Sequence, residues 1–191
     1  MAEKPEGTAD RVVRAITDDG AFRVIAARTT ATVRGALAAQ KARGEVAARF
    51  GELLTGTILV REAMAPALRL QGILKGKGKG SLVADSHPDG SSRGLVNFGG
   101  AGKDMVFGPG SILQVMRTLP GGAMHQGVIE VPFDEDGPSP RPLGEDGSAM
   151  PQVRRWGPVS AGLMAYMQDS EQMGKLVLRI HREASGQLLG A

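Results

Sequence analysis

No cysteine occurs among the 191 residues of this chain, so the sequence supplies neither a disulfide nor a thiolate ligand for a metal ion. Aromatic residues make up only 4% of the chain, which leaves aliphatic side chains to fill the core. No apolar run approaches the ~20 residues that a membrane-spanning helix needs. The first ten residues are polar and do not resemble a signal peptide. These absences favour a cytoplasmic globular protein that has no membrane partner.

The net charge is also small. A formal charge of +3 does not call for nucleic acid as a partner, so none is expected. Glycine, by contrast, is abundant at 28 residues, about double its usual share. So many glycines indicate frequent turns, which favours strands over a bundle of helices.

The order of patterns predicts a single α+β domain in which antiparallel sheets pack against helices. Residues 1–10 are expected to form a flexible arm, and 11–191 the domain. A strand pair around the turn Asp18-Asp19-Gly20 should form a hairpin. The expected strands are Arg11–Thr17, Ala21–Arg28, Ala67–Lys75, Ser81–Ser86, Arg93–Phe98, Ser111–Leu119 and Gln126–Val131.

Two consecutive helices are predicted between the hairpin and the later strands. Thr29 or Thr30 should cap the first helix, over Thr32–Arg43. The second, over Glu45–Glu62, has one apolar stripe along a single face, formed by Val46, Phe50, Leu53, Leu54 and Ile58.

The last third of the chain begins with a long exposed loop. Residues 132–158 contain six prolines and several acidic residues, which is typical of a loop. A short helix over Val159–Met167 and an alternating strand over Lys175–Arg182 are predicted to follow.

A run of alternating lysine and glycine is the most unusual local feature. Lys75, Lys77 and Lys79 suit contacts with a polyanion such as RNA, but neither phosphate-binding glycine motif fits this run. A solvated β-turn, whose lysines discourage edge-to-edge aggregation, is the favoured interpretation.

No catalytic, metal or cofactor site is predicted. Ser92 lies in a G-x-S-x-G pattern, but a strand rather than a helix follows it, so the match is taken as chance. The three histidines, His87, His125 and His181, show no metal-binding spacing.

Methionines cluster near the last predicted helix. Flexible thioethers suit adaptable binding surfaces, although methionines more often fill gaps in a core, and the core role is favoured. The residues considered for binding a client or partner are Tyr166, Met164, Met167 and Met173.

Several segments, in order along most of the chain, resemble one family. They include Gly51-Glu52-Leu53-Leu54-Thr55, the strand Leu68–Gly72, the paired strands Ser81–Asp85 and Arg93–Val96, the strand Gln126–Glu130, and Tyr166 followed by Ser170-Glu171-Gln172. This order is similar to that of the heat-shock protein 33 family of redox-regulated bacterial holdases.

The resemblance implies an ATP-independent chaperone that binds unfolded proteins, with a homodimer as a further expectation. In the family a C-terminal domain binds zinc through four cysteines, whose oxidation activates the protein. This sequence has no cysteine, so the expected chaperone lacks that switch. The alternative is a scaffold subunit that kept the fold and binds one dedicated partner.

Overall fold

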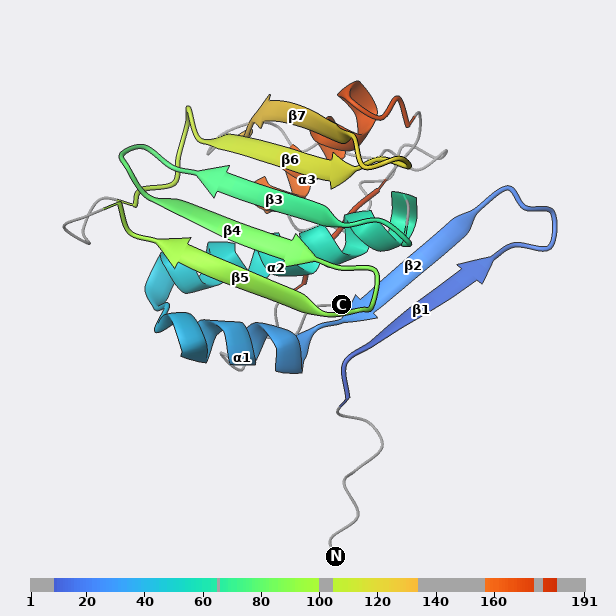
Figure 1. Cartoon of the computed structure of the whole chain (residues 1–191), viewed down its shortest axis with the longest axis horizontal. Helices are drawn as coiled ribbons and strands as arrows, with labels where there is room; N and C mark the ends of the chain where they lie inside the picture. The colour runs from blue at the N-terminus through green and yellow to red at the C-terminus, as the bar shows by residue number, and fades with distance from the viewer. Residues whose placement is uncertain (1–8, 65, 100–104, 134–156, 174–176, 182–191) are drawn as a thin grey trace, which may run out of the picture.

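The computed structural model describes residues 9–64, 66–99, 105–133, 157–173 and 177–181. They form an α+β fold, as predicted (Figure 1). Three helices are described: α1 (Thr30–Gln40), α2 (Gly44–Met64) and α3 (Pro158–Asp169). The described strands are β1 (Arg11–Ile16), β2 (Arg23–Arg28), β3 (Leu70–Lys75), β4 (Ser81–Ser86), β5 (Ser92–Asn97), β6 (Ile112–Thr118) and β7 (Met124–Glu130).

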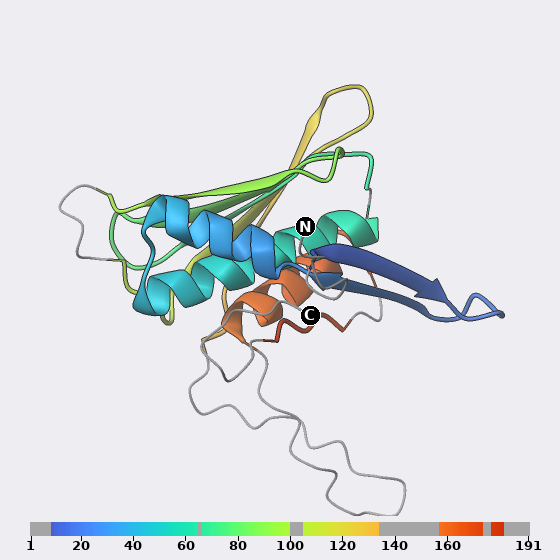
Figure 2. The same cartoon turned by 90° about the horizontal axis from the view of Figure 1, so that it is seen from below.

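The strands form two antiparallel sheets. β3 to β7 make a five-stranded sheet in the order β5-β4-β3-β6-β7, with β3 at its centre. β1 and β2 form a separate hairpin that projects beside the helices. Figure 2 shows the layers edge-on: the large sheet lies on one side, and the helices cover only one of its faces.

The core fills the space between the helices and the inner face of the large sheet. In the central strands β3, β4 and β6 alternate residues point inward and are buried, because side chains alternate across a pleated strand. In β3 these are Leu70, Gly72 and Leu74. A side chain at position 72 would not fit, since an added Cβ would lie 2.7 Å from Thr57 Oγ1 in α2.

Most of helix α2, from Phe50 to Glu62, is buried on all sides, not along a single stripe. Every residue from Phe50 to Glu62 is buried, charged ones included. The prediction of one apolar face was therefore incomplete, because the large sheet, α1, α3 and the hairpin surround this helix. Its buried Glu62 is satisfied by Arg61 and by Arg14 of β1.

The cap of α1 comes from outside the helix and corrects the sequence prediction. Thr29 stands at the N-cap position without a side-chain capping bond. Its hydroxyl instead forms a buried 2.8 Å hydrogen bond with that of Thr55. The carboxylate of Asp10 accepts hydrogen bonds from the backbone N–H groups of Ala31 and Thr32, at 2.9 and 2.6 Å. Asp10, the last residue of the expected flexible arm, thus anchors the chain to α1.

The predicted C-terminal strand is wrong within the part described. Residues 177–181 show the expected alternation, with Leu178 buried and Val177 exposed, but they pair with no described strand. Packing of Leu178 against the core accounts for the pattern without a ladder. The predicted loop 132–158 lies mostly outside the described residues, and Pro158 belongs to α3, at the first helical position.

Candidate functional site

The outer face of the five-stranded sheet carries a row of side chains, four apolar and one glutamine, that no described element covers. The ladder registers place Leu95, Val83, Ile73, Gln114 and Val128 side by side across all five strands. We call these five residues the outer row. Its two ends are the most open, with Leu95 53% and Val128 54% exposed. All three helices contact the opposite face, so the outer row meets solvent.

Further apolar side chains extend this surface along β6 and β7. Ile112 is 39% exposed and Met124 is 60% exposed. The register also places Met116 beside Gln71 on the same face. Monomeric proteins seldom leave adjoining apolar residues of this kind open, so a surface like this indicates an interaction site.

A charged cluster lies at one end of the same face, around Asp85. Arg69 donates two 2.8 Å hydrogen bonds to the carboxylate of Asp85, and His87 Nε2 lies 3.1 Å from it. Arg93 donates to it at 3.3 Å. Burial would raise the pKa of Asp85, but the bonds and charges of Arg69 and His87 outweigh it and hold this pKa below its ordinary value. The cluster forms a polar border to the outer row.

The predicted polyanion-binding lysines lie at the opposite end of β3. Lys75, Lys77 and Lys79 are exposed, and Lys75 Nζ donates to Gln114 Oε1 at 3.3 Å. The backbone N–H of Lys77 is bonded to Val106 O at 2.8 Å and is not free to bind phosphate.

The glycines between these lysines have structural roles. A Cβ on Gly76 would lie 2.3 Å from Val106 O, and Gly78 has a φ of 104°. The predicted solvated turn therefore holds for the lysine side chains, which are exposed. It does not hold for the backbone of Gly76 and Lys77, which packs against Val106. Binding of a polyanion stays a prediction.

The four residues considered for client binding divide into core and edge. Tyr166 and Met167 are fully buried, whereas Met164 and Met173 are partly buried against the core. In this conformation Tyr166 and Met167 cannot touch a partner, because no part of either side chain reaches the surface. The burial of Met167 is consistent with the gap-filling role favoured for the methionines, and client binding by Met164 and Met173 stays a prediction.

Tyr166 instead belongs to a buried polar network centred on Glu171, which the sequence did not single out as a site. Tyr166 Oη donates to Glu171 Oε1 at 2.5 Å, and Arg117 donates two bonds to the same carboxylate at 2.8 and 2.7 Å. His125 Nε2 lies 3.5 Å away. Burial and the bond to Glu171 raise the pKa of Tyr166, which keeps its hydroxyl protonated. The Tyr-x-x-x-Ser-Glu-Gln pattern thus ties α3 to β6.

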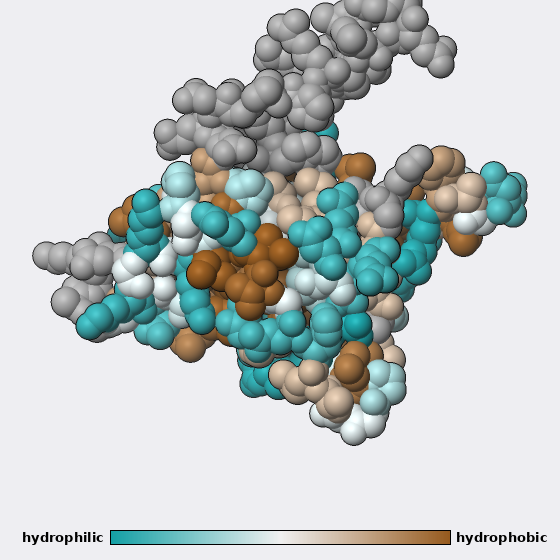
Figure 3. All heavy atoms as spheres, turned by 90° about the horizontal axis from the view of Figure 1, so that it is seen from above, coloured by the Kyte–Doolittle hydropathy of each residue, from teal (hydrophilic) through white to brown (hydrophobic). Residues whose placement is uncertain are grey.

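Apolar side chains also gather on the side of the molecule formed by β7 and α3. Figure 3 shows hydrophobic atoms at the centre of this face, with hydrophilic residues around them. Partly buried apolar residues of these elements include Ile129 and Met164. This surface adjoins the outer face of the sheet along β7.

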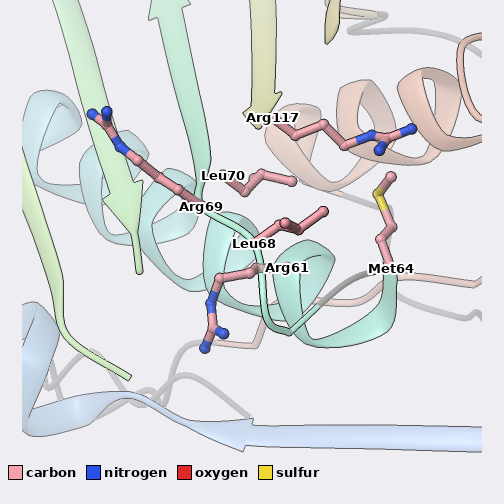
Figure 4. Close-up of a pocket in the computed structure, with 6 residues that line it drawn as sticks. All are labelled: Arg61, Met64, Leu68, Arg69, Leu70 and Arg117. Carbon is pink, nitrogen blue, oxygen red and sulfur yellow. The ribbon is translucent and has the colours of Figure 1, made fainter. Parts of the chain in front are cut away.

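A small hollow lies where α2 ends and β3 begins. It is a shallow depression with a volume of about 160 Å3, open solvent included, and it is lined by Arg61, Met64, Leu68, Arg69, Leu70 and Arg117. Figure 4 shows the three guanidinium groups pointing away from one another. Each is engaged elsewhere: Arg61 with Ser86, Arg69 with Asp85 and Arg117 with Glu171. Pockets for small ligands hold roughly 300–1,000 Å3, so this hollow is too small for a nucleotide.

The geometry of a serine hydrolase is also missing at the G-x-S-x-G pattern. Ser92 is the first residue of strand β5, and its hydroxyl lies 3.2 Å from that of Ser86. His87 is engaged with Asp85, not with Ser92. In the part of the chain that the structure describes, no group of three or more metal-ligating side chains occurs. None of the described helices is both long and apolar enough to cross a bilayer.

Comparisons with known proteins agree with this geometry. The family described as "Hsp33 protein" matches residues 10–186, nearly the whole chain. The crystal structure of the 33 kDa chaperonin (heat shock protein 33 homolog) of Thermotoga maritima superposes with a TM-score of 0.63 at 17% identity. This match covers 94% of the present chain but 58% of the Thermotoga protein. The family match over most of the sequence, together with the shared fold, shows that this chain belongs to the Hsp33 family of chaperones.

Proposed function

We propose that this chain binds exposed apolar segments of unfolded proteins without ATP, as a holdase. The observation that carries the proposal is the outer row, whose four apolar members flank Gln114 on a sheet face that no described element covers. Membership of a chaperone family supports it. A site that binds many different unfolded sequences depends on apolar surface area more than on shape complementarity, because the hydrophobic effect is not directional.

The outer row suits such binding in size and in its borders. Burying a fully exposed large aliphatic side chain contributes roughly 1.5–3 kcal/mol, and the half-exposed Leu95 and Val128 would each contribute about half of that. Several such contacts would hold a client segment weakly and reversibly. The Asp85 cluster at one end and Lys75 at the other keep the surface soluble and limit its extent.

The proposal includes an activity that does not depend on thiol chemistry. The 191 residues contain no cysteine, so oxidants and reductants have no thiol to act on in this stretch. A cytoplasmic location and a homodimer, both expected from the sequence, are parts of the same proposal.

The experiment measures light scattering of a thermally unfolded test protein, such as citrate synthase, with and without the intact chain. The chain should suppress aggregation without ATP, and to the same extent in peroxide or dithiothreitol. The double variant Leu95→Glu and Val128→Glu should lose most of this effect, because two charges interrupt the outer row. Val177→Glu is the matched control, since Val177 is 74% exposed and lies outside both sheets.

Scattering that stays at its control level with equimolar chain would overturn the holdase proposal. Suppression by the outer-row variant equal to that of the unaltered chain would remove the outer row as the binding surface. Suppression limited to one protein among many would favour the alternative of a subunit with a dedicated partner.

A further inference from the structure

Strand β1 has a free edge. Among the described elements, its backbone lies beside β2 and no other. Thr17 N donates to Phe22 O at 3.0 Å, so the N–H of Thr17 points toward β2. N–H groups alternate sides along a strand, and those of Arg14 and Ile16 therefore face away from β2. A free edge of this kind is a template for pairing with another extended chain.

The other edges described are partly occupied. β2 lies against α2, where Arg23 also donates a 2.6 Å bond to Ala63 O. On β5, the side chain of Gln40 accepts a 3.0 Å bond from the N–H of Val96. β7 lies against α3. The edge of β1 combines six residues of strand with backbone contacts to no described element other than β2.

One face of the hairpin is also bare and mostly apolar. The register places Val13 opposite Ala26 and Ala15 opposite Val24, and all four are exposed. Val13 is 52% and Val24 is 62% exposed. Phe22, 70% exposed, continues this face toward the turn.

Two arginines end this apolar face at the base of the hairpin. Arg11 stands directly opposite Arg28, and neither makes an ion pair with a described residue. Like charges directly opposite each other on a sheet are destabilising. The nearest acid in sequence, Asp10, is engaged as the cap of α1. An acidic side chain placed beside this pair would relieve the repulsion.

From these observations we propose that β1 binds an extended segment of an unfolded polypeptide as an added third strand. The segment pairs with β1 and places an acidic residue beside Arg11 and apolar residues beside Val13 and Ala15. This inference rests on the proposed holdase function and names a recognition mode for it. Main-chain pairing suits such a function because every unfolded chain carries the same N–H and C=O groups, whatever its sequence.

The hairpin is built to accept such a strand. A two-stranded sheet is only marginally stable alone, and a third strand adds both hydrogen bonds and apolar contacts. The ion pair between Arg14 and Glu62 and the bond from Arg23 to Ala63 hold the hairpin to α2. The edge is therefore fixed in place before a segment arrives, which lowers the entropic cost of binding.

The first test uses a fluorescent peptide as long as β1, six residues, with one glutamate followed by alternating valine and threonine. Its binding to the intact chain is measured by fluorescence anisotropy. A second peptide of the same sequence carries N-methyl groups on alternate backbone nitrogens, which removes the donors for one edge. We expect the methylated peptide to bind at least about tenfold more weakly, since two or more hydrogen bonds are lost. Equal affinity of the two peptides would overturn the proposal.

The second test changes the edge itself. Ile16→Pro removes an N–H that faces away from β2 and leaves the bonds between β1 and β2 in place. Ile16→Thr is the matched control, because it alters the same side chain and retains the N–H. Ile16→Pro should weaken peptide binding by about three- to tenfold relative to Ile16→Thr, with unchanged thermal unfolding. Equal binding by both variants would count against pairing at β1.

The arginine pair is tested by charge. The glutamate peptide should bind several-fold more tightly than a peptide with lysine in its place. The double variant Arg11→Gln, Arg28→Gln should bind the two peptides with equal affinity. A preference that survives both changes would place the acidic residue elsewhere.

Three measurements separate this inference from the proposed holdase function and from dimer formation at β1. If the chain suppresses aggregation but Ile16→Pro does so equally well, the holdase function stands and β1 is not its site. If aggregation is not suppressed while peptide binding depends on Ile16, strand addition stands and the holdase function fails. Sedimentation velocity tests whether a second copy of the chain occupies the edge instead. A dimer that the peptide does not dissociate, but that the Ile16→Pro variant fails to form, would overturn the proposal.

Discussion

Gly127 of β7 lies directly against the ring of Tyr166 in α3: a Cβ on this glycine would come within 2.6 Å of the ring carbon Cε2. The same Cβ would meet Ser170 Oγ at 2.6 Å. The absence of a side chain therefore lets α3 approach the inner face of the sheet. In this position Tyr166 Oη donates a hydrogen bond to Glu171 Oε1.

Gly127→Ala should destabilise the protein by about 1–3 kcal/mol, because the added methyl group forces the buried ring or β7 to move. Urea unfolding followed by circular dichroism measures the change. Gly35→Ala is the matched control: nothing lies within 4 Å of its Cβ, and it sits inside α1. Alanine favours helix over glycine by roughly 0.5–1 kcal/mol, so the control should gain stability. A loss of stability in both variants would show that the contact with Tyr166 is not the cause.

Glu171→Gln should cost about 2 kcal/mol or more at neutral pH, since it leaves Arg117 partly buried without its counter-charge. Burial tends to raise the pKa of Glu171, but bonds from Arg117 and Tyr166 lower it below its ordinary value of 4.5. A carboxyl group whose pKa is lower in the folded state stabilises the fold fully at any pH above its pKa in the unfolded state. This stabilisation is lost as the pH falls through its pKa in the folded state. The advantage of wild type over Glu171→Gln should therefore shrink below pH 4.5.

Unfolding free energies from pH 7 down to pH 3 check this dependence. Glu130→Gln is the control, because Glu130 is exposed on β7 and the same charge is removed. A difference between wild type and Glu171→Gln that stays constant over this range would contradict the assigned network.

Asp10→Ala should destabilise the protein by about 1 kcal/mol, since two backbone N–H groups at the start of α1 lose their acceptor. Asp10→Asn should recover much of this loss, because the amide oxygen still accepts a hydrogen bond. Asp18→Ala, in the hairpin turn, serves as the control and should change stability little. Thermal unfolding compares the three variants, and equal midpoints for Asp10→Ala and Asp18→Ala would rule out the cap.

Arg14→Gln should loosen the hairpin without unfolding the domain. Arg14 reaches from β1 to the buried carboxylate of Glu62 in α2. Its loss should speed hydrogen exchange of β1 and β2 amides by about fivefold, which corresponds to about 1 kcal/mol of local stability. Amides of β3 to β6 should be unaffected. Arg34→Gln, exposed on α1, is the control, and faster exchange across the whole chain in Arg14→Gln would argue against a local anchor.

Local patterns in the sequence predicted most elements to within a few residues. Asp18-Asp19-Gly20 marked the hairpin turn, and the alternation of Leu70, Gly72 and Leu74 marked the inner face of β3. The strand expected at Lys175–Arg182 failed for a physical reason. Alternating burial arises wherever an extended segment lies on a core, and Leu178 does so without a hydrogen-bonded partner strand.

The candidate site was predicted less well. Tyr166 and Met167 were considered for a binding surface, but packing of α3 against β6 and β7 buries both. The outer row was not recognised, since its members come from five strands whose order is set by pairing of β3 with both β4 and β6. Glu171 carried no signal beyond its place after Tyr166.

The sequence by itself determined the elements, the lack of thiol chemistry and the family, because turn residues, periodicity and motif order act over short stretches of chain. Tertiary structure alone decided that most of α2 is buried on every side, that Asp10 caps a helix 21 residues away, and that β1 keeps a free edge. Each of these depends on contacts between distant segments, and such contacts are chosen by packing and hydrogen bonding of the whole domain rather than by local propensity.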